Sequence, residues 1–389
     1  MNRPVGGFPA MTDLLRQEIA TLADLIVVKV GTRVLTHDDG RLNEERVERL
    51  AEELHELALT GRRVVLVSSG AVGAGIGRLG LPGRPRDLAQ LQAVAAVGQS
   101  HLIEVYDRCL RKHGRHAAQL LLTAEDLNHR TRYLNVRNTL LALMEFGAIP
   151  IINENDTVAV EELQTTFGDN DRLAALVTNL LRAPLMILLS DVEGLYDRDP
   201  QDPAAQVIST VADLNGDILA LVRDAKTGLS KGGMASKLRA ARIATAAGEN
   251  VIIASGRRPG VLAEIMSGEV TGTLFLARGQ NVSSRKRWIG FTVQPRGILD
   301  LDAGATRAVV EQGRSLLAIG VVGVGGDFRK GDVVVLRDPA GQEIARGLAN
   351  YSADEVRTIR GLRTEQIAAA LGQCPYDEVI HRDNLMLTA

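Results

Sequence analysis

The chain has 389 residues, 45% of them hydrophobic and 24% charged, a composition typical of a folded protein with two or three domains. Its 45 Lys and Arg residues nearly balance 47 Asp and Glu residues, which excludes a general attraction to nucleic acid or anionic membranes. The two cysteines lie far apart in the sequence, which argues against a disulfide framework and indicates a cytoplasmic protein. No apolar run approaches the roughly 20 residues of a membrane-spanning helix.

Residues 1–22 contain acidic side chains and lack the apolar core of a signal peptide, so we interpret them as an N-terminal extension. From residue 23 to 276, short apolar runs alternate with segments of helical periodicity. The expected strands are 25–30, 63–67, 119–122, 148–152, 185–189 and 251–254, the expected helices are 43–59, 87–112, 134–146, 171–181 and 234–247, and a hairpin is expected at 157–166. This alternation predicts an α/β domain whose mainly parallel sheet is covered by helices on both faces.

The pattern changes in the last third of the chain. The polar, basic segment 277–287 is typical of a linker, and the strands that follow are short and separated by Gly- and Asp-containing turns. Those strands are expected at 321–324, 333–337 and 343–348. We therefore predict a small, mostly β, barrel-like domain over residues 288–389. Residues 281–389 contain 14 basic and 13 acidic residues, a balance that argues against RNA binding.

Ligands of parallel α/β sheets bind beyond the carboxyl ends of the strands, and two of the expected strand ends suit anion binding. Lys29 stands in an apolar strand, where an ammonium group is costly unless it faces a site or a partner. The glycine-rich segment 68–75 follows the next strand, and its backbone amides can approach a carboxylate or phosphate closely. The alternatives are a lysine that reaches solvent and a tight strand–helix turn.

Two further strand ends carry polar clusters. INEND at 152–156 and GDND at 168–171 suit binding of an amino group, support of a phosphate-bound Mg²⁺ or orientation of lysines, although such clusters also serve as turns and helix caps. Ser190 and Asp191 end another strand, and KGGMASK at 231–237 then leads into a helix. Lysine is scarce in this chain, with only seven residues, so two in one glycine-rich segment favour a phosphate site over solvated surface lysines.

The sequence gives no support for other common catalytic sites. HxH and HExxH are absent and no GxSxG elbow follows an expected strand, which removes the support for a zinc site or a serine hydrolase. Two glycine-rich anion loops, two lysines and several Asp and Asn residues remain. This combination indicates phosphoryl transfer by positioning and electrostatic stabilisation, with no covalent nucleophile and no metal held by protein ligands alone.

Taken in order, these motifs resemble the amino acid kinase family. The matching segments are VVKVGT at 27–32, VSSGAVGAG at 67–75, INEND, GDND, LSDVEGLY at 189–196, KGGMASK and RKRWI at 285–289. Together, INEND and GDND resemble the corresponding motifs of the family members that phosphorylate the γ-carboxylate of L-glutamate. The segments GDFRKGD and IARGLANYSADEV, within 326–356, resemble a PUA domain. The resemblance extends from about residue 25 to the C-terminus.

The resemblance implies ATP-dependent phosphorylation of L-glutamate, the first step of proline biosynthesis, with Mg²⁺ bridging the phosphates. It implies that Lys29 and Lys237 stabilise the transferring phosphoryl group and that Asp171 orients both lysines. The implied glutamate-binding residues are Ser69, Gly70, Ala71, Asp156 and Asn170. The implied ATP-binding residues are Lys29, Ser190, Asp191, Lys231, Gly232, Gly233, Met234 and Lys237.

The resemblance also implies inhibition by proline at a site that overlaps the glutamate site, and homo-oligomerisation through the kinase domain. The chain departs from the family at Ser230-Lys231, where Gly-Thr is usual, and this leaves the path of the loop open. One alternative is a family member that acts on N-acetylglutamate or aspartate, against which INEND and the PUA-like tail argue. The other is a PUA-based RNA-binding protein with a degenerate kinase domain, against which the retained Lys29, Lys237 and Asp171 argue.

Overall fold

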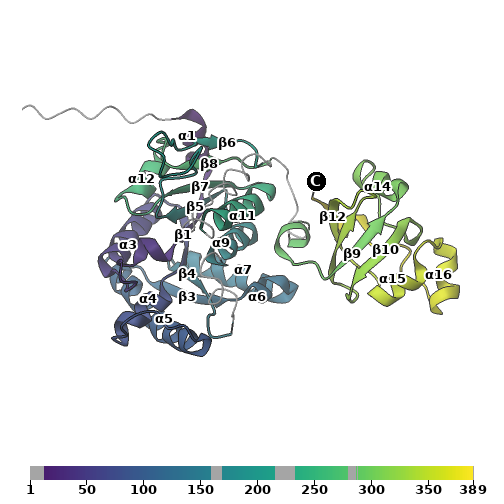
Figure 1. The fold of residues 1–389 in the computed structure, drawn as a ribbon, viewed down its shortest axis with the longest axis horizontal. Helices are drawn as coiled ribbons and strands as arrows, with labels where there is room; N and C mark the ends of the chain where they lie inside the picture. Colours follow the sequence, from purple (N-terminus) through teal and green to yellow (C-terminus); the bar gives the residue numbers. More distant parts are fainter. Residues whose placement is uncertain (1–12, 159–168, 215–232, 279–285, 287, 389) are drawn as a thin grey trace, which may run out of the picture. The chain divides into compact units, whose positions relative to one another are not determined.

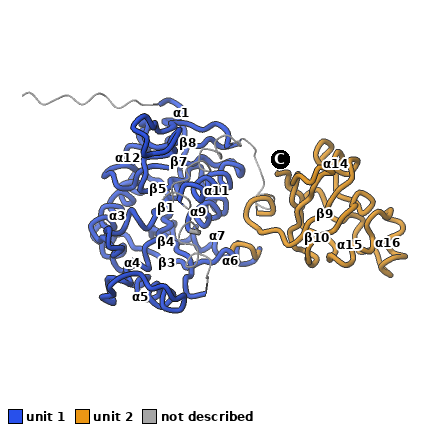
Figure 2. The backbone as a smooth tube through the Cα atoms, in the orientation of Figure 1, with its two compact units in different colours: residues 1–126, 130–280 blue, residues 127–129, 281–389 orange. Residues whose placement is uncertain are grey.

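The computed structural model describes residues 13–158, 169–214, 233–278, 286 and 288–388 (Figure 1). The chain divides into two compact units (Figure 2), unit 1 within residues 1–126 and 130–280 and unit 2 within residues 127–129 and 281–389. Unit 1 has the α/β architecture that the sequence predicts, and unit 2 contains a separate β-sheet. No helix in the described ranges is long and apolar enough to cross a membrane.

Unit 1 is built on an eight-stranded sheet with the strand order β3-β4-β2-β1-β5-β7-β8-β6. Its strands are β1 (Leu25–Val30), β2 (Arg63–Ser68), β3 (Ala117–Leu122), β4 (Ile149–Glu154), β5 (Leu185–Ser190), β6 (Thr210–Val211), β7 (Asn250–Ser255) and β8 (Thr273–Phe275). The pairs from β3 through β7 are all parallel, and β8 runs antiparallel to β7. The register aligns Val30 with Ser68 on one side and with Leu189 on the other, so the carboxyl ends of β1, β2 and β5 meet at one edge.

Helices cover both faces of this sheet, as expected (Figure 1). The helices described in this part of the chain are α1 (Leu14–Leu22), α2 (Thr32–Leu35), α3 (Glu44–Leu59), α4 (Ala71–Arg78), α5 (Leu88–Arg111), α6 (Ala124–Asn128), α7 (Arg130–Glu145), α9 (Asp169–Leu181), α11 (Gly233–Ala246) and α12 (Val261–Met266). Helices α3, α5 and α12 share one hydrophobic core with the sheet. Helices α7, α9 and α11 pack against the opposite face.

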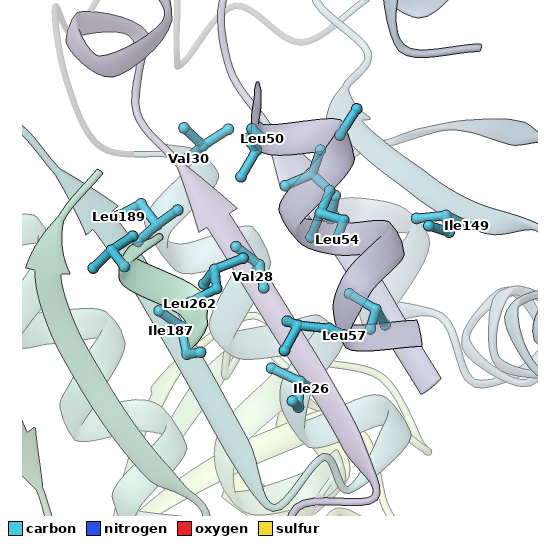
Figure 3. Packing of buried hydrophobic residues seen from close by; sticks show 14 of the residues in the cluster. Ile26, Val28, Val30, Leu50, Leu54, Leu57, Ile149, Ile187, Leu189 and Leu262 are labelled. Carbon is cyan, nitrogen blue, oxygen red and sulfur yellow. The ribbon is translucent and has the colours of Figure 1, made fainter. Parts of the chain in front are cut away.

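Strand alternation decides which side chains of β1 enter each layer. Val28 and Val30 pack toward α3, where Leu50 and Leu54 meet them (Figure 3). Because successive side chains of a strand point to opposite faces, Lys29 is directed toward α9. Helix α3 contributes the periodic apolar face that the sequence predicts and begins at the Asn43 cap, whose side chain accepts from the Arg46 N–H.

Two parts of unit 1 differ from the expected pattern. Helix α4 occupies the segment for which the sequence predicts an anion-binding loop or a tight turn. Helix α1 occupies the second half of the expected N-terminal extension, and the buried Arg16 guanidinium donates to the carbonyl oxygens of Ser209, Thr271 and Gly272. The hairpin expected at 157–166 lies outside the described residues, except for the turn at Thr157 and Val158.

Unit 2 contains a five-stranded sheet with the order β10-β9-β11-β12-β13. Its elements are β9 (Gly297–Leu301), β10 (Val321–Gly326), β11 (Val333–Arg337), β12 (Glu343–Leu348), β13 (Leu385–Leu387), α14 (Ala303–Val310), α15 (Ala353–Ile359) and α16 (Thr364–Leu371), with short helical turns at Trp288–Thr292, Ala318–Gly320 and Arg382–Asn384. Strands β9 and β11 are parallel, and the other pairs are antiparallel. The unit has a hydrophobic core of its own, which includes Leu299, Leu336 and Val356.

Candidate active site

Three charged side chains from three different elements meet at the carboxyl end of the sheet. Asp171, in the first turn of α9, places Oδ1 2.6 Å from Lys29 Nζ of β1 and Oδ2 3.3 Å from Lys237 Nζ of α11. All three side chains are buried, with exposed fractions of 6% for Lys29, 1% for Asp171 and 10% for Lys237. The structure thus brings together the three residues predicted to be catalytic.

Lys29, Asp171 and Lys237 form a charged triad, and their mutual interactions shift the pKa values of Asp171 and Lys237. Burial by itself would raise the pKa of Asp171, but the ammonium groups of Lys29 and Lys237 hold it below the usual value. Burial and the neighbouring charge of Lys29 lower the pKa of Lys237. Two cations share one anion, so the triad carries one net positive charge in a desolvated position. A phosphoryl group entering this site would supply the missing negative charge.

The predicted substrate residues Ser69 and Asn170 are also in contact. Asn170 lies next to Asp171 in α9, and its Nδ2 donates to Ser69 Oγ at 3.0 Å. Gly70 has φ +111°, a left-handed conformation that favours glycine, and Ala71 begins helix α4 directly after it. The first-turn N–H groups of α4 lack carbonyl partners within the helix, which suits an anionic ligand. This corner of the site can therefore bind a carboxylate.

Asn153 is a buried member of this cluster that the sequence analysis did not single out. It lies in β4, its Oδ1 accepts from Asn170 Nδ2 at 2.9 Å, and its Nδ2 donates to Gln99 Oε1 at 2.7 Å. The sequence offers one signal for Asn153, which is its place in the INEND segment that also contains Asp156. Its hydrogen bond with Asn170 connects the motif to the predicted substrate residues.

Asp156 lies in the turn after β4 and is half-buried. Desolvation raises the pKa of its carboxyl to about 6, against an opposing effect of the Arg84 guanidinium. No hydrogen bond joins Asp156 to Ser69 or Asn170 among the residues that the structure describes. Its assignment to the substrate site therefore stays a prediction.

The predicted nucleotide residues fall into two groups. Ser190 ends β5, its Oγ donates to Asp191 Oδ1 at 3.2 Å, and Arg33 Nη1 lies 3.2 Å from Asp191 Oδ2. Burial alone would raise the pKa of Asp191, but its hydrogen bond with the guanidinium of Arg33 leaves it lowered. Gly233 and Met234 open helix α11, and the Gly233 carbonyl lies 3.4 Å from Lys237 Nζ. Lys231 and Gly232, like Ser230, lie outside the described residues.

Comparison with known proteins identifies the family of both parts of the chain. The model of the amino acid kinase family matches residues 24–255, and the model of the PUA domain matches residues 297–371. A protein of Rhodopirellula baltica named glutamate 5-kinase is 52% identical over 373 residues, which cover 96% of each chain. Proteins of the same name from Caldanaerobacter subterraneus and Moorella thermoacetica are each 48% identical over 93% of this chain and over 97% and 96% of their own lengths.

The family assignment agrees with the sequence motifs and with the contacts among the residues of those motifs in the fold. The kinase model spans the segments that carry Lys29, Asp171 and Lys237, and the PUA model starts at the first strand of unit 2. At 52% identity over nearly the whole length, the relationship extends far beyond the glycine-rich loops. The chain belongs to the amino acid kinase family, among the relatives named glutamate 5-kinase, and it carries a C-terminal PUA domain.

Proposed function

We propose that this chain transfers the γ-phosphoryl group of ATP to the γ-carboxylate of L-glutamate, giving L-glutamyl 5-phosphate and ADP, as the first step of proline biosynthesis. The observation that carries the proposal is the juxtaposition of two groups on adjacent residues of α9. Asp171 holds the two lysines, and Asn170 holds Ser69 beside the start of α4. A cationic phosphate site and a carboxylate site therefore share one helix terminus. The names of the relatives support glutamate as the acceptor.

The chemistry requires little from a general base. The side-chain carboxylate of glutamate has a pKa of about 4.3 and is ionised at neutral pH, so it can attack phosphorus without losing a proton. A bond forms between a carboxylate oxygen and the γ-phosphorus while the bond to the β,γ-bridging oxygen breaks, and ADP leaves. The principal barrier is the repulsion between two anions. Lys29 and Lys237 reduce it, and Asp171 keeps both ammonium groups in place.

Mg²⁺ is the ion that this reaction class uses with ATP, where it neutralises charge on the β- and γ-phosphates. Within the described ranges, no three His, Cys, Asp or Glu side chains are placed to hold a metal together. Both carboxylate oxygens of Asp171 already lie beside lysines. We propose that the nucleotide phosphates carry the ion.

We extend the proposal to binding and control. Asp156 is assigned to the ammonium group of glutamate, and Ser69 with the amides of Gly70 and Ala71 to a carboxylate. Proline has the same α-carboxylate and an ammonium group but no γ-carboxylate, so it would occupy these groups without accepting phosphate and act as an inhibitor. Assembly into a homo-oligomer through the kinase domain and a cytoplasmic location complete the proposal.

The test is ADP release by the purified chain with Mg-ATP and, in parallel, L-glutamate, N-acetyl-L-glutamate, L-aspartate or UMP. We expect activity with L-glutamate alone and an acyl phosphate that hydroxylamine traps as the hydroxamate. Lys29→Met should abolish the activity, whereas Lys112→Met, at the exposed end of α5, should leave it unchanged. Activity with a different acceptor, or none with L-glutamate, would refute the proposal.

A further inference from the structure

Gln99 lies in the middle of helix α5, and neither its sequence context nor the proposed chemistry assigns it a role. Its side chain is 7% exposed, and its Oε1 accepts a hydrogen bond from Asn153 Nδ2 at 2.7 Å. Asn153 Oδ1 accepts from Asn170 Nδ2 at 2.9 Å, and the same Nδ2 donates to Ser69 Oγ at 3.0 Å. A continuous series of buried side-chain hydrogen bonds thus runs from α5 to Ser69.

This series has a direction, because a primary amide has one donor end and one acceptor end. Gln99 Oε1 can only accept, so Asn153 turns Nδ2 toward it and turns Oδ1 toward Asn170. Asn153 Oδ1 also accepts from the Glu154 N–H at 2.9 Å, which strengthens the same orientation. Asn170 must then present Nδ2 to both Asn153 and Ser69.

The last member of the series is the Ser69 hydroxyl. Its Oγ accepts from Asn170, and no other described residue accepts the hydrogen of this hydroxyl. A hydroxyl group has one donor hydrogen and two acceptor positions, so Ser69 retains its hydrogen for a ligand. A carboxylate, which only accepts, is the matching ligand.

Close packing fixes the first member of the series. Gly98 precedes Gln99, and a Cβ atom at Gly98 would overlap the Ala71 carbonyl oxygen and the Gly75 nitrogen. A Cβ at Gly75 would in turn overlap the Val94 carbonyl oxygen. The backbones of α4 and α5 therefore touch, and Gln99 has a fixed position relative to the start of α4.

A glutamine at position 99 also lowers the stability of the fold. Its Nε2 is buried without a hydrogen-bond partner among the described residues, and an unsatisfied buried donor destabilises the folded state. A methionine would fill a similar volume without that cost. Packing alone therefore does not account for the glutamine, whereas its acceptor oxygen does have a use.

We infer that Gln99 is a positioning residue for the acceptor substrate: through Asn153 and Asn170 it directs the Ser69 hydroxyl to donate to a substrate carboxylate. The inference rests on the proposed function, because the carboxylate is that of L-glutamate. It adds a residue of a different helix, in contact with no reacting atom, to the determinants of glutamate affinity.

The experiment compares Gln99→Met with the wild-type chain in steady-state ADP release. Methionine keeps the length of the side chain and removes the acceptor. We expect the KM for L-glutamate to rise about tenfold, the factor that corresponds to one hydrogen bond of about 1.4 kcal/mol, with the KM for ATP unchanged within twofold. Gln90→Met, on the exposed first turn of the same helix, is the matched control and should leave both constants unchanged.

A second arm places Gln99→Met in a Ser69→Ala background. Because the glutamine acts through the serine hydroxyl, its replacement should raise the KM for L-glutamate less than threefold once that hydroxyl is gone. Equal fold-changes in the two backgrounds, or a parallel rise in the KM for ATP, would overturn the inference. Gln99→Ala replaces Gln99→Met if thermal unfolding shows that the methionine variant does not fold.

Two outcomes distinguish a failure of the proposed function from a failure of the role of Gln99. If the wild-type chain and Gln90→Met release no ADP with L-glutamate, the proposed function is wrong. If both are active and Gln99→Met has the wild-type KM for L-glutamate, the function stands and the inference about Gln99 is wrong.

Discussion

The carboxylate of Asp171 separates two buried ammonium groups, so its removal affects both catalysis and folding. In Asp171→Asn the lysines would repel each other without compensation, and breaking a buried ion pair costs about 3–5 kcal/mol. We expect kcat to fall by about 10²–10³, the scale of a lost electrostatic contact at a transition state, together with a lower free energy of unfolding. Steady-state kinetics and urea unfolding measure the two effects.

The control for that substitution is an exposed ion pair of the same unit. Asp24 lies 2.6 Å from Arg63, but both side chains are largely exposed, so water screens the pair. Asp24→Asn should change the free energy of unfolding by less than about 1 kcal/mol and leave kcat unchanged. A similar loss in both variants would show that Asp171 has no special role.

The raised pKa of Asp156 gives a second prediction at the scale of single residues. The carboxyl titrates at about 6, so it is ionised at neutral pH and becomes neutral in mild acid. If it binds the ammonium group of glutamate, kcat/KM for L-glutamate should fall about tenfold per pH unit below pH 6, because the protonated form has lost its charge. Asp156→Asn should lower kcat/KM at pH 8 and remove this acidic limb. An unchanged acidic limb in the variant would assign it to another group.

The residues of the candidate site differ in how clearly the sequence identifies them. Lys29 could be found because an ammonium group within an apolar strand is costly without a purpose. Asn153 could be placed only in a motif, since a run of polar residues does not show which side chain turns inward. Gln99 gave no signal, because a glutamine within a helix is common and its partner Asn153 is 54 positions away. Such a contact depends on the packing of α5 against the sheet.

At the scale of elements, helix α1 depends on one buried arginine. Arg16 is 2% exposed and donates to three backbone carbonyls, including Thr271 at 2.8 Å. Arg16→Met would remove the guanidinium donor from all three carbonyls, of which only that of Ser209 is known to keep another donor, the Leu274 N–H, and the lost buried hydrogen bonds cost about 1–3 kcal/mol. We expect a loss of this size in the unfolding free energy of unit 1, measured by urea titration. Glu18→Gln, on the exposed side of α1, should have almost no effect, and equal losses would contradict the prediction.

Periodicity predicted the longer elements and failed for the glycine-rich ones. Helix α3 followed from its regular apolar positions, and β1 and β5 from their apolar runs. Helix α4 was not predicted as a helix because it contains Gly73, Gly75 and Gly77, which have low helix propensity. The contact with α5 explains one of these glycines, because Gly75 of α4 and Gly98 of α5 let the two backbones touch. A tertiary contact of this kind outweighs local propensity and leaves no periodic signal.

At the scale of the whole molecule, the change in sequence pattern near residue 280 predicted the division into two architectures. Each unit has a separate hydrophobic core, one centred on β1 and α3 and the other on β9, β11 and α15. The boundaries at residues 276 and 288 stay predictions. The number of units could be predicted because a strand–helix alternation and a series of short strands differ over many residues, whereas a boundary depends on a few.

Two separate cores predict two unfolding transitions in calorimetry of the full chain. A non-hydrolysable ATP analogue together with L-glutamate, each at about 100 times its dissociation constant, should stabilise unit 1 by at least about 2.7 kcal/mol, because both bind its folded state. For a unit of this size the gain corresponds to a rise of about 5–10 °C in one transition. The other transition should stay in place. A single transition that moves as a whole would show that the two units unfold together, and a shift of both would place a ligand in unit 2.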